Sequence, residues 1–94
     1  MTAHLDEIRI FIGNDISDDE YEARRRIRSC RNAASFKAHR TESTIARKLS
    51  WMVAELGSAW VYAPSDAETL TEAATLLRRL LTCADQAEAL EAVE

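Results

Sequence analysis

The chain has 94 residues, of which 30% are charged and 47% hydrophobic, and its formal net charge is −4. This length suits a single domain over residues 1–94, and a chain this short buries only about 60–65% of its unfolded surface, which favours self-association. Two widely separated cysteines exclude a disulfide-dense secreted domain and a zinc-finger type of site.

The first predicted element is a strand over residues 7–14. Its isoleucines recur at every second position, which gives one apolar and one mixed face. They are Ile8, Ile10 and Ile12. The segment 13–15, Gly-Asn-Asp, then supplies turn residues.

A long helix is predicted to follow, because Ser17 and Glu20 have the spacing of a capping box. Its inward stripe repeats at steps of four, three and four. The stripe consists of Ala23, Ile27, Cys30 and Ala34. A break is expected at residues 39–43, where Thr41 or Ser43 can cap a second helix.

The second helix is predicted to end at Gly57 in a left-handed cap. Its predicted apolar stripe comprises Ile45, Leu49, Met52 and Leu56, supported by Val53. A second short strand is expected over residues 59–63, closed by Pro64. Trp60 and Tyr62 on that strand are expected to lie in the core or in a subunit interface.

A third helix is predicted to start at Ser65, with Glu68 completing another capping box. Its broad apolar face comprises Leu70, Ala73, Ala74, Leu77, Leu80, Leu81 and Ala84. The segment 85–94 is expected to extend this helix and then fray. The predicted fold class is therefore α+β and mostly helical, in the order β-α-α-β-α with two short strands and three helices. Two strands make a marginal sheet, so pairing within the chain and a homodimer sharing one sheet both remain open.

Charge is concentrated in the middle of the chain. The segment 24–48 holds nine of the twelve basic residues and one acidic residue, Glu42, whereas the segments before and after it each carry a net charge of −6. The alternative to a binding role is a solvated helix face balanced by the acidic ends. Nine cations against one anion exceed what solubility needs, so we favour a surface that docks on an acidic protein or on nucleic acid.

Nine residues are the predicted partner-binding set. They are Arg24, Arg25, Arg28, Arg31, Lys37, Arg40, Arg47, Lys48 and Trp51. Trp51 lies off the apolar stripe of its helix, and interfaces are enriched in Trp and Arg. Phe36 also lies off its stripe, and for this residue a place in the core is favoured.

No constellation in the sequence supplies a positioned base, nucleophile or metal site, and the two glycines form no phosphate-binding loop. The chain is therefore predicted to be non-enzymatic, without cofactor or metal. The leading function is a small interaction protein, an inhibitor or adaptor. Size and character alone associate it with regulators encoded by phages and mobile elements, including inhibitors of bacterial defence.

The alternative function is a dimeric transcriptional regulator that binds nucleic acid. The segment 44–50 resembles the Ile-Ala-x-x-Leu opening of helix-turn-helix motifs, and residues 57–63 would supply the strand of a winged helix. The helical pattern, however, continues past Leu49 without the turn that this motif has.

Compartment and thiol state follow from composition. No apolar run has membrane-spanning length, and residues 1–7 lack the features of a signal peptide, so a cytoplasmic protein without a membrane partner is expected. Cys30 and Cys83 are predicted to be two buried free thiols, and a bridge between them remains open if their helices pack together.

Overall fold

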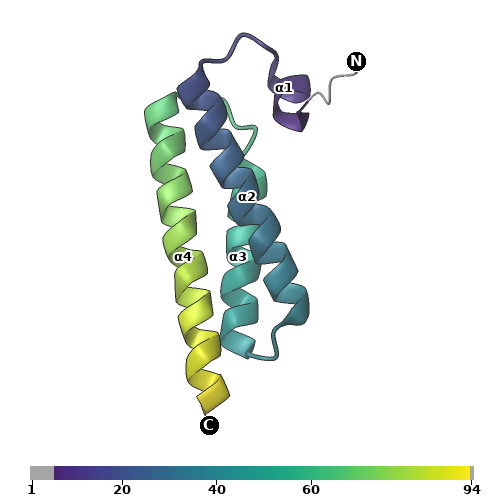
Figure 1. Cartoon of the computed structure of the whole chain (residues 1–94), viewed down its shortest axis with the longest axis vertical. Coiled ribbons are helices and arrows are strands. Elements are labelled where there is room, and N and C mark those ends of the chain that lie inside the picture. The colour runs from purple at the N-terminus through teal and green to yellow at the C-terminus, as the bar shows by residue number, and fades with distance from the viewer. Residues whose placement is uncertain (1–5, 94) are drawn as a thin grey trace.

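A computed structural model describes residues 6–93 and shows four helices and no strand over that range. The helices are α1 (Glu7–Ile12), α2 (Asp18–Arg40), α3 (Thr44–Trp60) and α4 (Ala67–Val93). The three long helices form one bundle in which α3 runs antiparallel to α2 and α4, and α1 lies near the start of α2 (Figure 1). Residues 1–5, part of the segment behind the localisation prediction, and residue 94 lie outside the described range.

The predicted α+β class is wrong, and its first strand is a short helix. Asp6 caps α1, because its Oδ1 accepts a hydrogen bond from the Ile8 N–H at 2.8 Å. Gly13 closes α1 at a φ of 111°, and its N–H donates to the carbonyl of Arg9. Alternating isoleucines do suit a strand, but residues 6–93 offer no second strand to satisfy its backbone groups.

The second predicted strand, over residues 59–63, is also wrong. Helix α3 continues to Trp60, and the Val61 N–H donates to the carbonyl of Gly57 at 2.9 Å. Gly57 is therefore an interior helical residue and not a left-handed cap. Its role is steric, because a Cβ at this position would lie 2.8 Å from the Cβ of Arg31 on α2.

The predicted helix starts are largely confirmed. The Ser17 hydroxyl accepts from the Glu20 N–H at 3.1 Å, and the Ser43 hydroxyl accepts from the Ala46 N–H at 3.0 Å. The predicted break corresponds to the non-helical residues 41–43. Helix α4 is instead capped one residue later than predicted, by Asp66, whose Oδ1 accepts from the Thr69 N–H at 2.7 Å.

The core confirms two of the three predicted apolar stripes. On α2 the stripe is buried as predicted, and on α4 the buried residues are Leu70, Ala74, Leu77 and Ala84. The stripe on α3 is wrong. The buried residues of α3 are Ala46, Ser50, Val53, Ala54 and Gly57, whereas Ile45, Met52 and Leu56 are exposed. Small residues thus let α3 approach its neighbours closely, and the large ones face outward.

The structure also tests the predicted positions of Phe36, of the two cysteines, and of Trp60 with Tyr62. Phe36 is 62% exposed, so its assignment to the core is wrong. Both cysteines are free, and only Cys30 is buried, since Cys83 is exposed. Trp60 and Tyr62 pack partly buried against the core.

None of the helices within residues 6–93 combines the length and apolar character needed to cross a membrane.

Candidate interaction surface

Arg24, a member of the predicted binding set, is buried inside the bundle. Only 1% of it is exposed, and its guanidinium makes three hydrogen bonds. Nε and Nη2 donate to Glu20 Oε2 at 3.1 and 2.9 Å, and Nη1 donates to the Val61 carbonyl at 2.8 Å. The expectation that it faces outward is therefore wrong, because it anchors the turn after α3 onto α2.

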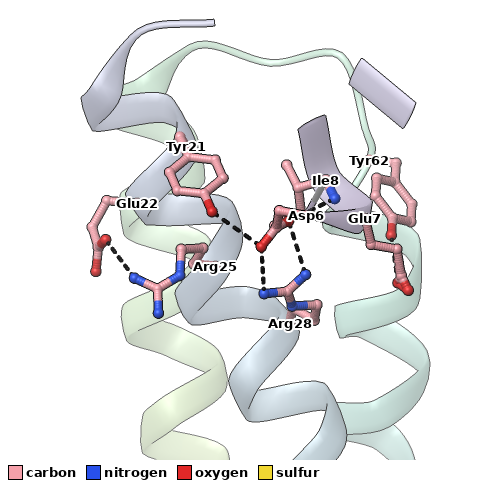
Figure 2. A network of polar contacts seen from close by, with 8 residues as sticks. All are labelled: Asp6, Glu7, Ile8, Tyr21, Glu22, Arg25, Arg28 and Tyr62. Atoms are coloured by element: carbon pink, nitrogen blue, oxygen red, sulfur yellow. Dashed lines mark hydrogen bonds and ion pairs between the residues drawn. The ribbon is translucent and has the colours of Figure 1, made fainter. Parts of the chain in front are cut away.

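Arg28 holds α1 against α2. Its two terminal nitrogens each donate to one carboxylate oxygen of Asp6 at 3.0 Å, and the Tyr21 hydroxyl donates to the same carboxylate at 3.0 Å. Figure 2 shows Asp6 receiving all of these bonds. The hydrogen bonds from Arg28 are the main reason why the pKa of Asp6 falls from 3.8 to about 2. Arg28 is thus committed to a contact within the chain.

Lys37 ties the end of α2 to α4. Its Nζ lies 2.9 Å from Asp85 Oδ1 and 2.6 Å from Glu88 Oε1. The hydrogen bond to Glu88, followed by the one to Asp85, raises the pKa of Lys37. Two carboxylates of the acidic segment 49–94 therefore neutralise this cation.

Arg25 and Arg31 are engaged more weakly. The Arg25 guanidinium pairs with Glu22 at 3.2 Å, and both side chains are about half exposed. Arg31 donates from Nε to Asn32 Oδ1 at 3.2 Å, while its stem packs over Gly57. Such exposed pairs exchange readily with solvent or with another anion.

The last four predicted residues gather at the turn between α2 and α3, at the end of the bundle far from α1 (Figure 1). We call Arg40, Arg47, Lys48 and Trp51 the basic end. Arg40 lies with its guanidinium carbon 4.4 Å from the centre of the Phe36 ring, and Arg47 donates to the Thr41 carbonyl at 3.2 Å. Within residues 6–93, none of the three cations pairs with a carboxylate.

Trp51 supplies an apolar surface beside these charges. It is 41% exposed, and the His39 ring meets it edge-on with the ring centres 5.1 Å apart. His39 Nδ1 lies 2.8 Å from the Ser35 carbonyl, which fixes the ring against α2. An aromatic ring supported in this way can anchor a partner without losing much rotational freedom.

The sequence reasoning missed a second cationic group, on α4. Arg26, Arg78 and Arg79 line a groove of about 530 Å³ between α2 and α4, together with the hydroxyl-bearing Ser29 and Thr75. We call this the arginine groove. Arg78 and Arg79 were counted within the acidic segment 49–94, although they are its only two cations. Their adjacency on a predicted helix was the signal that pointed to them.

Residues 6–93 contain no cluster of three or more His, Cys, Asp or Glu side chains arranged to hold a metal ion. No protein-family model matches the chain, and no curated protein or solved structure shows significant similarity to it.

Proposed function

We propose that this protein is a small non-enzymatic binding protein, an inhibitor or adaptor, that docks its basic end on an acidic surface of another protein. The observation that carries the proposal is the set of three exposed cations, Arg40, Arg47 and Lys48, without carboxylate partners within residues 6–93. The basic residues of α2 before Arg40 all have hydrogen-bond or ion-pair partners within the chain. Arg78 and Arg79 of the arginine groove also pair with no carboxylate within residues 6–93, but they lie on α4, away from the basic end.

The chemistry of the basic end fits an acidic protein patch with an apolar centre. Arg guanidinium groups bind carboxylates in a fork geometry, and an adjacent Lys adds a mobile point charge. Trp51 and Phe36 are exposed beside these cations and give the contact an apolar element. A charged rim around an exposed aromatic residue steers association and supplies a buried anchor.

The test compares two triple variants that each remove three positive charges. One variant changes the basic end, Arg40→Ala/Arg47→Ala/Lys48→Ala, and the other changes the arginine groove, Arg26→Ala/Arg78→Ala/Arg79→Ala. Tagged chains are used to capture partners from the organism that encodes the protein, and captured proteins are quantified by mass spectrometry. We expect the basic-end variant to lose an acidic partner by about tenfold or more. The groove variant should retain it.

Equal capture by wild type and the basic-end variant would reject the proposal. Circular dichroism serves as the folding control, and both variants should keep wild-type helicity because every changed side chain is exposed.

A second candidate, nucleic-acid binding, draws on the arginine groove. Three guanidinium groups beside two hydroxyls match the groups that contact phosphate oxygens. This candidate predicts that affinity for a generic duplex falls steeply between roughly 50 and 200 mM salt, and that the groove variant flattens the slope. Absence of duplex binding at low salt would eliminate this candidate and leave docking on protein untouched.

A further inference from the structure

The outer side of α3 is a row of large apolar side chains. Ile45, Leu49, Met52 and Leu56 follow one another at steps of four, three and four, the spacing of a buried helical stripe. Three of them are exposed and Leu49 is half-buried. This apolar stripe, whose spacing is typical of a buried helix face, therefore lies on the surface of the single chain.

Helix α4 continues this row beside α3. Its core-facing seam, Leu70, Ala74, Leu77, Leu81 and Ala84, is joined by a second seam at Ala73, Leu76 and Leu80. Leu76 is 56% exposed. A helix with two adjacent apolar seams at steps of three and four packs on two sides. The bundle buries the first seam and covers the second only in part, since Ala73 and Leu80 are half-buried and Leu76 is exposed.

The two rows meet in an apolar groove of about 570 Å³ between α3 and α4. Leu56 and Trp60 form its α3 wall, and Ala73, Leu76 and Leu80 line its α4 wall. We call the groove and the exposed row of α3 the apolar face. Exposed large apolar residues that adjoin such a groove are typical of an interaction site.

The area of the molecule is large enough to bury one side of a standard protein–protein interface. The accessible surface is 6260 Å², whereas a compact monomer of 10.6 kDa exposes roughly 5500 Å². The excess is roughly 800 Å², about what each subunit contributes to a standard protein–protein interface.

The charges at the edge of the groove are also self-complementary. Glu72 and Arg79 both line the groove and lie seven residues apart on α4, roughly 10 Å along its axis. If a two-fold axis passes between these two residues, the second copy runs antiparallel. Glu72 of each chain then lies opposite Arg79 of the other chain. Arg79 also borders the arginine groove, so this pairing occupies one of that groove's three cations.

We infer that the apolar face binds a second copy of this chain, with the two α4 helices antiparallel across a two-fold axis near Leu76. The inference does not depend on the basic end, which lies at the α2–α3 turn, and each claim can fail without the other.

The test measures the mass of the full chain by sedimentation over roughly 1–100 µM, because dimer population depends on concentration. Wild type should reach twice the monomer mass. Leu76→Glu should weaken the dimer by about 100-fold, and Leu56→Glu repeats the test on the α3 wall. The matched control is Ile10→Glu, which adds the same charge at a comparably exposed apolar residue outside this groove and should leave the dimer intact.

A charge reversal tests the antiparallel arrangement. Glu72→Arg should weaken the dimer by about tenfold, and Glu72→Arg/Arg79→Glu should return to within about threefold of wild type. A wild-type chain that stays monomeric, or a Leu76→Glu chain that dimerises like wild type, overturns the inference. A double reversal no better than the single one overturns the antiparallel pairing. Circular dichroism verifies that each variant remains helical.

Discussion

The Cβ atom of Arg31 fills the space that a side chain at Gly57 would need, since a Cβ on residue 57 would lie 2.8 Å from it and 3.4 Å from the Arg31 Cα. The obstructing atoms belong to the start of the Arg31 side chain and its backbone, so they cannot swing aside as a side-chain end can. Helix α2 and helix α3 are therefore held at a separation that glycine permits.

Gly57→Ala is expected to lower the free energy of unfolding by about 1–2 kcal/mol, because the overpacking cost exceeds the gain in helix propensity. Urea unfolding monitored by circular dichroism measures the change. The control is Ser58→Ala on the exposed side of the same turn, which should stay within about 0.5 kcal/mol of wild type. A Gly57→Ala chain as stable as this control would contradict the steric role.

Arg24→Ala is expected to lower the free energy of unfolding by about 2–4 kcal/mol. The substitution leaves the Val61 carbonyl and the Glu20 carboxylate without their shared donor in a largely buried place. Arg25→Ala removes a neighbouring arginine of the same helix whose pair is exposed, and should cost less than about 0.5 kcal/mol. Denaturant unfolding of both variants makes the comparison, and equal losses would argue against a structural role specific to Arg24.

The ion pair between Asp6 and Arg28 should give the protein an acid-sensitive element. Because the pKa of Asp6 is about 2 in the folded protein and higher when unfolded, the pair stabilises the fold above about pH 4 and loses this effect as the pH falls toward 2. Asp6→Asn should lower the free energy of unfolding by about 1 kcal/mol at neutral pH, and by much less at acid pH. Unfolding curves across this range provide the measurement.

Asp15→Asn is the control for the acid effect, because Asp15 is an exposed carboxylate in the turn after α1. It should follow the wild-type pH dependence throughout. A stability difference between Asp6→Asn and wild type that is the same at acid and neutral pH would show that the carboxylate charge is not the cause.

The two thiols should differ in reactivity. Cys30 is buried, and burial raises the pKa of its thiol, which reduces the reactive thiolate. Cys83 is exposed. A chromogenic disulfide reagent should therefore modify one thiol quickly in the native protein and the second only on unfolding. Cys83→Ser should abolish the fast phase, and a fast phase that persists in this variant would place the accessible thiol at Cys30.

Local signals in the sequence were sufficient where a single side chain decides the structure. Ser17 and Ser43 cap helices because each hydroxyl accepts a hydrogen bond from the backbone N–H three residues later, which lies within the same helical turn. The strand predicted over residues 7–14 was wrong because six residues with alternating isoleucines satisfy either pattern, and the cap from Asp6 decided between them.

Contacts between distant segments could not be predicted in the same way. A glycine at position 57 is typical of a helix end. Here it lies within α3 because the Arg31 Cβ on α2 leaves no space for a side chain. The charge count found the basic segment but not the partners of its members. Arg28 pairs with a carboxylate 22 residues earlier, and Lys37 hydrogen-bonds to one 51 residues later. Arg24 is buried beside Glu20. Fewer cations are therefore free to bind a partner than the charge count predicted.

Ion pairs attach α1 to the middle of α2 at Arg28 and α4 to its last turn at Lys37, and this charge pattern has a consequence for the chain before it folds. An unfolded polymer with a cationic middle and two anionic arms contracts when ionic strength is low, because each arm is attracted to the centre. Added electrolyte relaxes that attraction and swells the coil. The carboxylates that form ion pairs in the folded bundle therefore also draw the acidic ends of the unfolded chain toward its basic middle.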